Sequence, residues 1–188
     1  IVNYSKINRL IKSDKVVLGT VWRDFIADCV PEAQDRINIL PNATRRSSIP
    51  HRTGGETVVI LFLGRVCERK GAPQLMDALN HLKSLSAWRA VIAGDGDLAT
   101  ARTRIRELGL DGRLQLPGWV GPGEVESLIA EADILVLPSF DENLPMSVIE
   151  GMAAGLAIVS TPVGAVEDII TDDQTGSRFA HFEGCFPG

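Results

Sequence analysis

Cysteine is scarce in this sequence, and its cysteines show no motif spacing. There are three, Cys29, Cys67 and Cys185, and no two of them form a C-x-x-C pair. This count and spacing exclude a disulfide framework and a zinc site as organising features. Because disulfides mark oxidising compartments, we expect a reduced, cytoplasmic location.

Long apolar runs are also missing. The longest, such as residues 58–63, fall far short of the roughly 18 residues that a membrane-spanning helix needs. The opening residues, IVNYSKINRLIKSDK, contain no apolar signal-peptide core and no initiating Met. We therefore expect no membrane span and no secretion signal, and we expect the chain to be a fragment or a processed product.

An excess of positive charge is the third absence. The chain has 19 Lys and Arg against 24 Asp and Glu, which gives a formal net charge of −5. This balance argues against a nucleic-acid partner bound through a broad basic face, although a local cationic pocket is compatible with it. The 188 residues, 45% of them hydrophobic, are enough for one complete core.

Apolar runs alternate with amphipathic stretches from about residue 57 onward. The runs are typical of strands buried on both faces, and the stretches between them have helical spacing. This alternation predicts an α/β fold with an open doubly wound parallel sheet, because right-handed crossovers place helices on both faces. The expected strands are 57–64, 88–94, 113–118, 133–139 and 156–161, and the expected helices are 73–85, 97–110, 123–132, 145–155 and 165–170.

The first part of the chain has a different organisation. It predicts a strand at 15–20, a helix at 21–30 and a strand that runs from about residue 36 into a polar segment with Gly and Pro. A strand–helix–strand unit is too small to bury a core of its own. We therefore interpret residues 1–42 as the end of a preceding domain, 43–56 as a linker, and 57–188 as the main domain.

Ligands bind outside the carboxyl ends of the strands in such sheets, so the loops after the strands are the candidate sites. The loop after the first strand of the main domain contains Arg65 and Lys70. Two cations there can clamp a phosphate, Arg through a planar fork and Lys as a point charge. The same loop can also be a solvated surface turn with Glu68 as a local counter-ion.

The loop after the second strand, GDGDLA, fits several motifs. Gly94, Gly96 and Ala99 match the G-x-G-x-x-A fingerprint of dinucleotide-binding domains. That fingerprint requires an acidic residue about 20 residues later, and the next strand carries none. Asp95 and Asp97 also form the D-x-D found in many metal-dependent sugar transferases. We favour a third interpretation, a tight turn in which Asp97 caps the following helix.

The stretch FDENLPMSVIEGMAAGL contains two glutamates, Glu142 and Glu150, with seven residues between them. Pro145 suits the first helical position, with Asn143 or Leu144 as the cap, since a Pro there loses only an orphaned donor. Glu142 then precedes the helix, and Glu150 lies about one and a half turns inside it.

The start of this helix also predicts an anion site. The free amides near Leu144, Met146 and Ser147 and the helix dipole favour a phosphate, and the carboxylates suit hydroxyl donors. A ligand with phosphates between two hydroxyl-rich sugars would use both. Alternatively, Glu142 is a loop charge and Glu150 a helix-surface residue.

These residues resemble a known family. The segment FDENLPMSVIEGMAAGLAIVSTPVGAVEDII resembles the signature of the group 1 retaining glycosyltransferases of the GT-B fold, whose E-x7-E motif Glu142 and Glu150 reproduce. FLGRVCERKG is similar to the family's G-R-x4-K phosphate loop. VIAGDGD, PGWV and ADILVLPS match the positions around it, and INILPNA resembles the linker that ends the acceptor domain.

The resemblance implies a nucleotide-diphosphate sugar donor, retention of anomeric configuration, no metal and no cofactor. Glu142 would contact the transferred sugar, Glu150 the ribose, and Arg65 and Lys70 the diphosphate. These implied catalytic residues, Glu142, Arg65 and Lys70, are joined by the implied donor-binding residues Gly64, Asn143, Leu144, Met146, Ser147, Glu150, Trp119 and Val120, the last two beside the base.

The sequence departs from the family pattern in three places. Only the end of the acceptor domain is present, in residues 1–42, so the acceptor stays unknown and membrane contact is expected only through the missing part. Pro145 replaces a frequent Gly, and the chain stops at SRFAHFEGCFPG without the family's closing helix. We expect a donor domain truncated at its C-terminus and inactive by itself, with exposed apolar surface where that helix would pack.

Two other functions are compatible with the sequence. A non-catalytic module could bind a nucleotide sugar with the same loops. A dinucleotide-binding oxidoreductase domain could use GDGDLA, and it would then require NAD(P) as a ligand.

Overall fold

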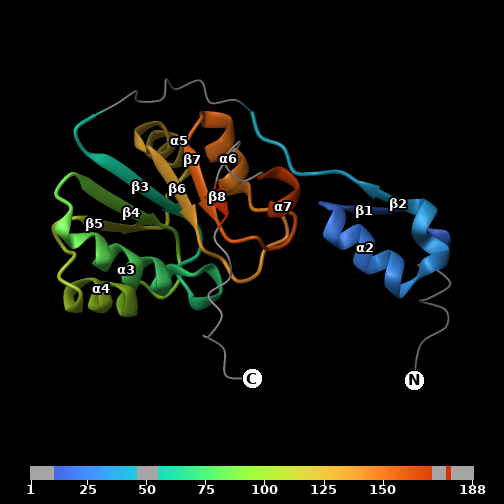
Figure 1. The fold of residues 1–188 in the computed structure, drawn as a ribbon, viewed down its shortest axis with the longest axis horizontal. Coiled ribbons are helices and arrows are strands. Elements are labelled where there is room, and N and C mark those ends of the chain that lie inside the picture. Colours follow the sequence, from blue (N-terminus) through green and yellow to red (C-terminus); the bar gives the residue numbers. More distant parts are fainter. Residues whose placement is uncertain (1–10, 46–54, 171–176, 179–188) are drawn as a thin grey trace.

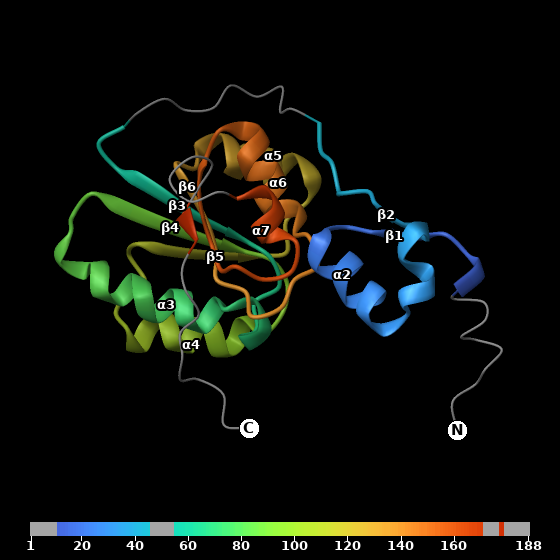
Figure 2. The ribbon, with the colours of Figure 1, turned by 45° about the vertical axis from the view of Figure 1, so that its right-hand side comes forward.

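The computed structural model describes residues 11–45, 55–170 and the backbone of 177–178. They form a small N-terminal lobe and a larger α/β domain, which lie side by side in Figure 1 and in the turned view of Figure 2. The lobe consists of β1 (Lys15–Val17), α2 (Thr20–Cys29), the 3-10 helix Pro31–Arg36 and β2 (Ile37–Ile39).

The larger domain alternates strands and helices along its whole described length. Short 3-10 helices at Glu68–Lys70 and Leu82–Ser84 flank its first α-helix. Its elements are β3 (Val58–Leu63), α3 (Ala72–His81), β4 (Trp88–Ala93), α4 (Leu98–Glu107), β5 (Leu114–Gly118), α5 (Pro122–Glu131), β6 (Ile134–Leu137), α6 (Met146–Ala154), β7 (Ala157–Ser160), α7 (Val166–Ile169) and β8 (Ser177–Arg178).

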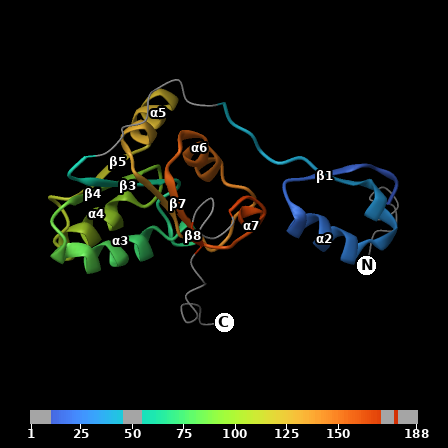
Figure 3. The same cartoon turned by 45° about the horizontal axis from the view of Figure 1, so that its top comes forward.

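The sheet is parallel and six-stranded, with the order β5-β4-β3-β6-β7-β8. Helices α3 and α4 cover one face and α5 and α6 the other, as Figure 1 and Figure 3 show. The strand order grows from β3 in one direction and then, with β6, in the other. The crevice between the carboxyl ends of β3 and β6 is therefore the topological switch point, where such sheets bind their ligands.

Burial on both faces explains why the sequences of the central strands are unbroken apolar runs. Residues 59–63 of β3 are all buried, because β4 and β6 flank the strand and helices cover both of its faces. Each element of the main domain predicted up to residue 170 occurs near its expected position. The predicted α/β fold with a doubly wound parallel sheet is confirmed.

The predicted helix 73–85 ends earlier than expected. Helix α3 stops at His81 and one 3-10 turn follows. The indole of Trp88 donates to the Leu82 carbonyl at 2.8 Å, and the Arg113 guanidinium donates to the Leu85 carbonyl. These side chains satisfy carbonyls that a longer helix would have bonded, so the chain can turn into β4.

The small lobe contains the expected strand–helix–strand unit but little core. Strands β1 and β2 pair in parallel, and α2 has no fully buried residue. Phe25 and Leu40 are 60% and 64% exposed. The domain limits at 42 and 56 stay a prediction, since part of the linker and residues 179–188, including the C-terminal truncation, lie outside the described residues.

Candidate functional site

The loops after β3 and β6 meet at the switch point through an ion pair. The Lys70 ammonium lies 2.5 Å from Oε1 of Glu142. The Glu142 carboxylate is buried, with 8% of the residue exposed, and the Lys70 side chain is 18% exposed. The structure thus brings together two residues that the sequence predicted for the site, and it pairs them directly.

Ser139 completes the surroundings of the Glu142 carboxylate. Its buried hydroxyl donates to the same Oε1 at 2.7 Å, and its own carbonyl accepts the Thr161 hydroxyl. A buried carboxylate needs such partners, because desolvating an unpaired charge is costly. Sequence reasoning missed Ser139, although its place at the carboxyl end of the predicted strand 133–139 was a signal.

Close backbone contacts hold the two loops together. Gly71 has φ +71°, and a Cβ there would lie 2.0 Å from the Pro138 carbonyl oxygen. The Phe140 amide also donates to the Arg69 carbonyl at 2.9 Å. Gly71 therefore allows both the left-handed turn and the approach that places Lys70 beside Glu142.

The GDGD turn packs against the loop that follows β3. A Cβ at Gly94 would lie 1.9 Å from the Gly64 carbonyl oxygen, and one at Gly96 would lie 2.3 Å from that of Val66. The Asp97 carboxylate accepts from the Thr100 amide at 3.1 Å, as expected of a helix cap. These glycines face neighbouring backbone, so the turn is not left open for the pyrophosphate of a dinucleotide.

Arg65 has a different setting from Lys70. It lies in the same loop as an exposed residue, and within the described part of the chain it makes no hydrogen bond or ion pair. Lys70, the other cation predicted to contact a phosphate, forms an ion pair with Glu142. A role for Arg65 in ligand binding stays a prediction.

Helix α6 begins one residue later than predicted. Pro145 is its N-cap, with an extended ψ of 127°, so neither Asn143 nor Leu144 is the cap. Leu144 is buried, and the Asn42 side-chain amide donates to its carbonyl at 2.9 Å. This contact holds the chain extended up to Pro145, which leaves the Met146 and Ser147 amides at the first helical positions.

The turn after β7 packs against the loop that carries Glu142. Gly164 has φ +60°, and a Cβ there would lie 2.1 Å from the Glu142 carbonyl oxygen and 2.6 Å from that of Asn143. The Ala165 amide donates to the Asn143 carbonyl at 2.7 Å. Sequence reasoning missed this turn, since nothing local to residues 142–150 points to it.

Glu150 lies inside α6, eight positions after Glu142 and in a different environment. It is partly buried and makes no hydrogen bond or ion pair with the described residues. Burial raises the pKa of its carboxyl above the ordinary value of 4.5. A partly desolvated carboxylate to which no described residue donates is suited to accept hydrogen bonds from the hydroxyl groups of a ligand.

The residues predicted to frame a base lie beyond β5. Trp119 is 74% exposed, and Val120 is partly buried against the core. Gly118 precedes them with φ +86°, and its carbonyl accepts the Gly94 amide at 2.8 Å. The structure therefore places Trp119 at an exposed rim, outside the ion-paired centre.

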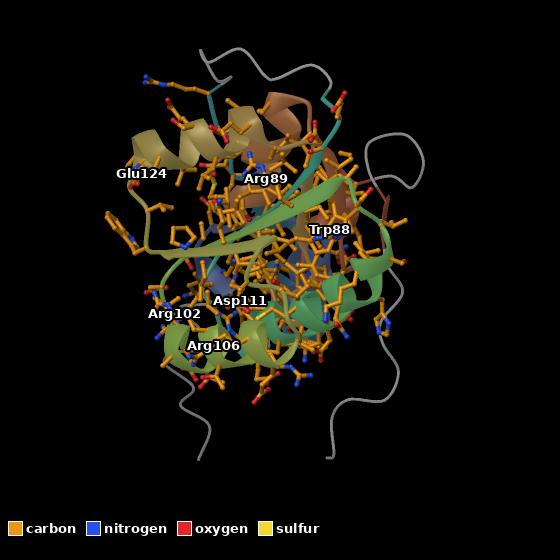
Figure 4. The ribbon with its side chains drawn as sticks, turned by 90° about the vertical axis from the view of Figure 1, so that its left-hand side faces the viewer. Trp88, Arg89, Arg102, Arg106, Asp111 and Glu124 are labelled. Carbon is orange, nitrogen blue, oxygen red and sulfur yellow. The ribbon has the colours of Figure 1, made fainter. Side chains whose placement is uncertain are left out.

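A separate groove lies on the outer side of α4 and β5. Its volume is about 330 Å³, and Figure 4 shows Arg102, Arg106 and Asp111 on this side of the domain. The groove contains none of the residues predicted for the site. Its lining is Arg102, Ile105, Arg106, Asp111, Leu114 and Leu116.

The described residues contain neither a metal-ligand cluster nor a membrane-spanning helix. Among residues 11–45 and 55–170, no three His, Cys, Asp or Glu side chains are grouped as metal ligands would be. No helix in the same part of the chain is both long and apolar enough to cross a membrane. Metal independence and cytoplasmic location stay predictions.

The α/β fold with its parallel sheet matches solved structures of the GT-B fold. Solved glycosyltransferase structures share this fold. HepE of Anabaena in complex with UDP matches 89% of this chain and 50% of its own, with a TM-score of 0.77 at 16% identity. The C-terminal domain of a group 1 glycosyl transferase (LpcC) of Francisella tularensis matches 73% and 75%, with a TM-score of 0.60 at 27% identity.

The sequence comparison identifies the family. The model of "Glycosyl transferases group 1" matches residues 45–181, so the chain belongs to this family. The lipopolysaccharide 1,6-galactosyltransferase of Escherichia coli is 32% identical over 154 residues, which are 78% of this chain and 43% of that protein. The chain thus spans less than half the length of this curated relative.

Proposed function

We propose that this chain is the donor-binding half of a metal-independent, retaining glycosyltransferase that transfers a hexosyl group from a nucleotide-diphosphate sugar. The Lys70–Glu142 ion pair at the switch point, beside the start of α6, is the observation that carries this proposal. A cation, a carboxylate and the first amides of a helix thus lie at the edge where open α/β sheets bind ligands. In this role the diphosphate binds the cations and amides, and the hydroxyl-rich ends bind the carboxylates.

The ion pair suits the chemistry of glycosyl transfer. The bond between the anomeric carbon and the leaving phosphate oxygen breaks, and negative charge grows on the diphosphate. The anomeric carbon bonds to an acceptor hydroxyl oxygen, whose proton passes to the leaving diphosphate. Lys70 can donate to that phosphate while it still holds Glu142, because an ammonium has three donors. Arg65 and the amides of Met146 and Ser147 add preorganised positive potential, which stabilises this charge without a metal ion. Glu142, held by the Ser139 hydroxyl, accepts hydrogen bonds from hydroxyl groups of the sugar.

A thermal-shift series with UDP, GDP and ADP and their sugars tests the proposal. A nucleotide at 100 times its Kd stabilises the folded chain by about 2.7 kcal/mol. At roughly 2–4 °C per kcal/mol, the melting temperature should rise by about 5–11 °C. NAD and NADP are the matched controls, and we expect no shift with them. A folded sample that no nucleotide stabilises would contradict the proposal, and binding without transfer or donor hydrolysis in the full-length protein would favour a non-catalytic module.

Replacing Glu150 by glutamine separates the effect of this residue on the stability of the chain from its effect on nucleotide binding. The folded state holds the Glu150 proton to a higher pH than the unfolded chain, so stability falls as pH rises through the window above 4.5. Glu150→Gln should therefore melt higher than the unmodified chain at neutral pH, and this gain should vanish below that window. The same variant should bind nucleoside diphosphates more weakly and pyrophosphate equally well. Equal weakening for both ligands would contradict the assignment of Glu150 to the ribose.

A further inference from the structure

The small lobe contacts the main domain through the first residues of α2. The backbone amide of Thr20 donates to Oδ2 of Asp168 at 2.6 Å, and its hydroxyl donates to Oδ1. One carboxylate, which follows α2 by more than a hundred residues, thus takes two donors at a helix N-terminus. Such a position favours a negative charge. Figure 3 shows α2 and α7 next to each other where the lobe meets the domain.

Two further observations show that this contact is close and not isolated. A Cβ at the buried Gly19 would lie 2.2 Å from the Ala165 Cβ and 2.5 Å from Oδ2 of Asp168. Asn42, at the other end of the lobe, independently donates its side-chain amide to the Leu144 carbonyl at 2.9 Å. The lobe therefore contacts the domain at two points, one on α7 and one on the loop before α6.

Both contacts involve residues that bind the backbone of the loop that carries Glu142. Ala165 lies between Gly19 on one side and the Asn143 carbonyl, which accepts its amide, on the other. Asn42 binds the next carbonyl along the loop, that of Leu144. Two consecutive carbonyls of the loop thus accept hydrogen bonds, one from a domain amide that packs against the lobe and one from a side chain of the lobe. The orientation of these peptides sets where the Glu142 carboxylate and the first amides of α6 point.

We propose that Asp168 is a positioning residue, and that its contact with Thr20 and the Asn42–Leu144 hydrogen bond together fix residues 142–145 in the geometry that binds the donor. This inference rests on the proposed function and extends it, because it assigns the lobe a part in donor binding. It requires the affinity for a nucleoside diphosphate to depend on residues of the lobe that do not touch the nucleotide.

Nucleotide affinity measured by calorimetry tests this coupling. Couplings between sites are typically about 5- to 150-fold, and for exposed hydrogen bonds we expect the low end, about a five-fold loss of affinity with Asp168→Ala. Thr20→Val should lose less, because the Thr20 backbone amide still donates to Asp168. The double variant should lose no more than Asp168→Ala alone, since Thr20→Val removes only the hydroxyl's hydrogen bond to that carboxylate and Asp168→Ala removes the amide's bond as well. Thr20→Ser and Asp168→Asn keep a donor and an acceptor and should restore most of the affinity. Asn42→Ala should add a separate loss, and Glu126→Gln, an exposed carboxylate on α5, is the control.

The separation of lobe and domain supplies an independent readout. With Cys67 and Cys185 replaced by serine, spin labels on the exposed Cys29 and on a cysteine introduced at Glu126 report this distance. Thr20→Val and Asp168→Ala should broaden the distribution. Variants that melt lower but keep full affinity and an unchanged distribution would overturn the proposal, because the contact would then be only structural. If the unmodified chain binds no nucleotide, the proposed function fails, and the distance distribution still decides whether the contact holds the lobe.

Discussion

Replacing Lys70 by methionine is expected to lower the free energy of unfolding by about 3 kcal/mol, because breaking one side of a buried ion pair strands the other charge. Glu142, 8% exposed, would retain the Ser139 hydroxyl as its one hydrogen-bond partner among the described residues. At roughly 2–4 °C per kcal/mol, the melting temperature should fall by about 6–12 °C. Differential scanning calorimetry of the purified chain measures this change.

The double variant Lys70→Met, Glu142→Gln separates stability from ligand binding. A neutral amide removes the stranded charge and can still accept from Ser139, so most of the lost stability should return. Affinity for nucleoside diphosphates should not return, because the phosphate cation is still absent. A single variant as stable as the unmodified chain would mean that Lys70 and Glu142 are not paired in solution. A double variant that binds normally would exclude Lys70 from phosphate binding.

The sequence predicted the fold well where burial is uniform along an element. Residues 58–63 form an unbroken apolar run because β3 lies between two strands and two helix layers. Such a run is typical of a strand buried on both faces. Asp97 was predicted as a cap from its place between a strand and a helix, and it accepts the Thr100 amide. The cap depends on neighbours along the chain, and the apolar run indicates burial on both faces whichever strands flank it, so both features can be predicted from local sequence.

The site could be predicted only in part, because its geometry depends on contacts between distant loops. Lys70 and Glu142 could be proposed for one site, but their direct pairing depends on the β3–β6 crevice. Ser139 and Gly164 contribute through a single hydroxyl and through the lack of a side chain. The start of α6 was misplaced by one residue because Asn42, far away in the sequence, binds the Leu144 carbonyl.

Replacing Gly164 by alanine is expected to have an even larger effect than the loss of Lys70. An alanine at φ +60° costs about 1–2 kcal/mol from the left-handed conformation alone. Its Cβ would also lie 2.1 Å from the Glu142 carbonyl oxygen and 2.6 Å from that of Asn143, and backbone atoms cannot move aside as a flexible side chain can. We expect a total loss of about 4 kcal/mol or more, a size reached only by severe local disruption.

Gly155 supplies the matched control for this prediction. It has φ +82°, close to that of Gly164, but a Cβ there meets nothing within 4 Å. Gly155→Ala should therefore show the conformational cost alone, about 1–2 kcal/mol, and leave nucleotide affinity unchanged. The difference between the two variants measures how tightly the turn at Gly164 packs against the Glu142 loop. If both variants lose the same stability and both bind nucleotide normally, the turn does not support the loop. A loss of affinity confined to Gly164→Ala would show that the position of the Glu142 backbone, and not only its carboxylate, controls donor binding.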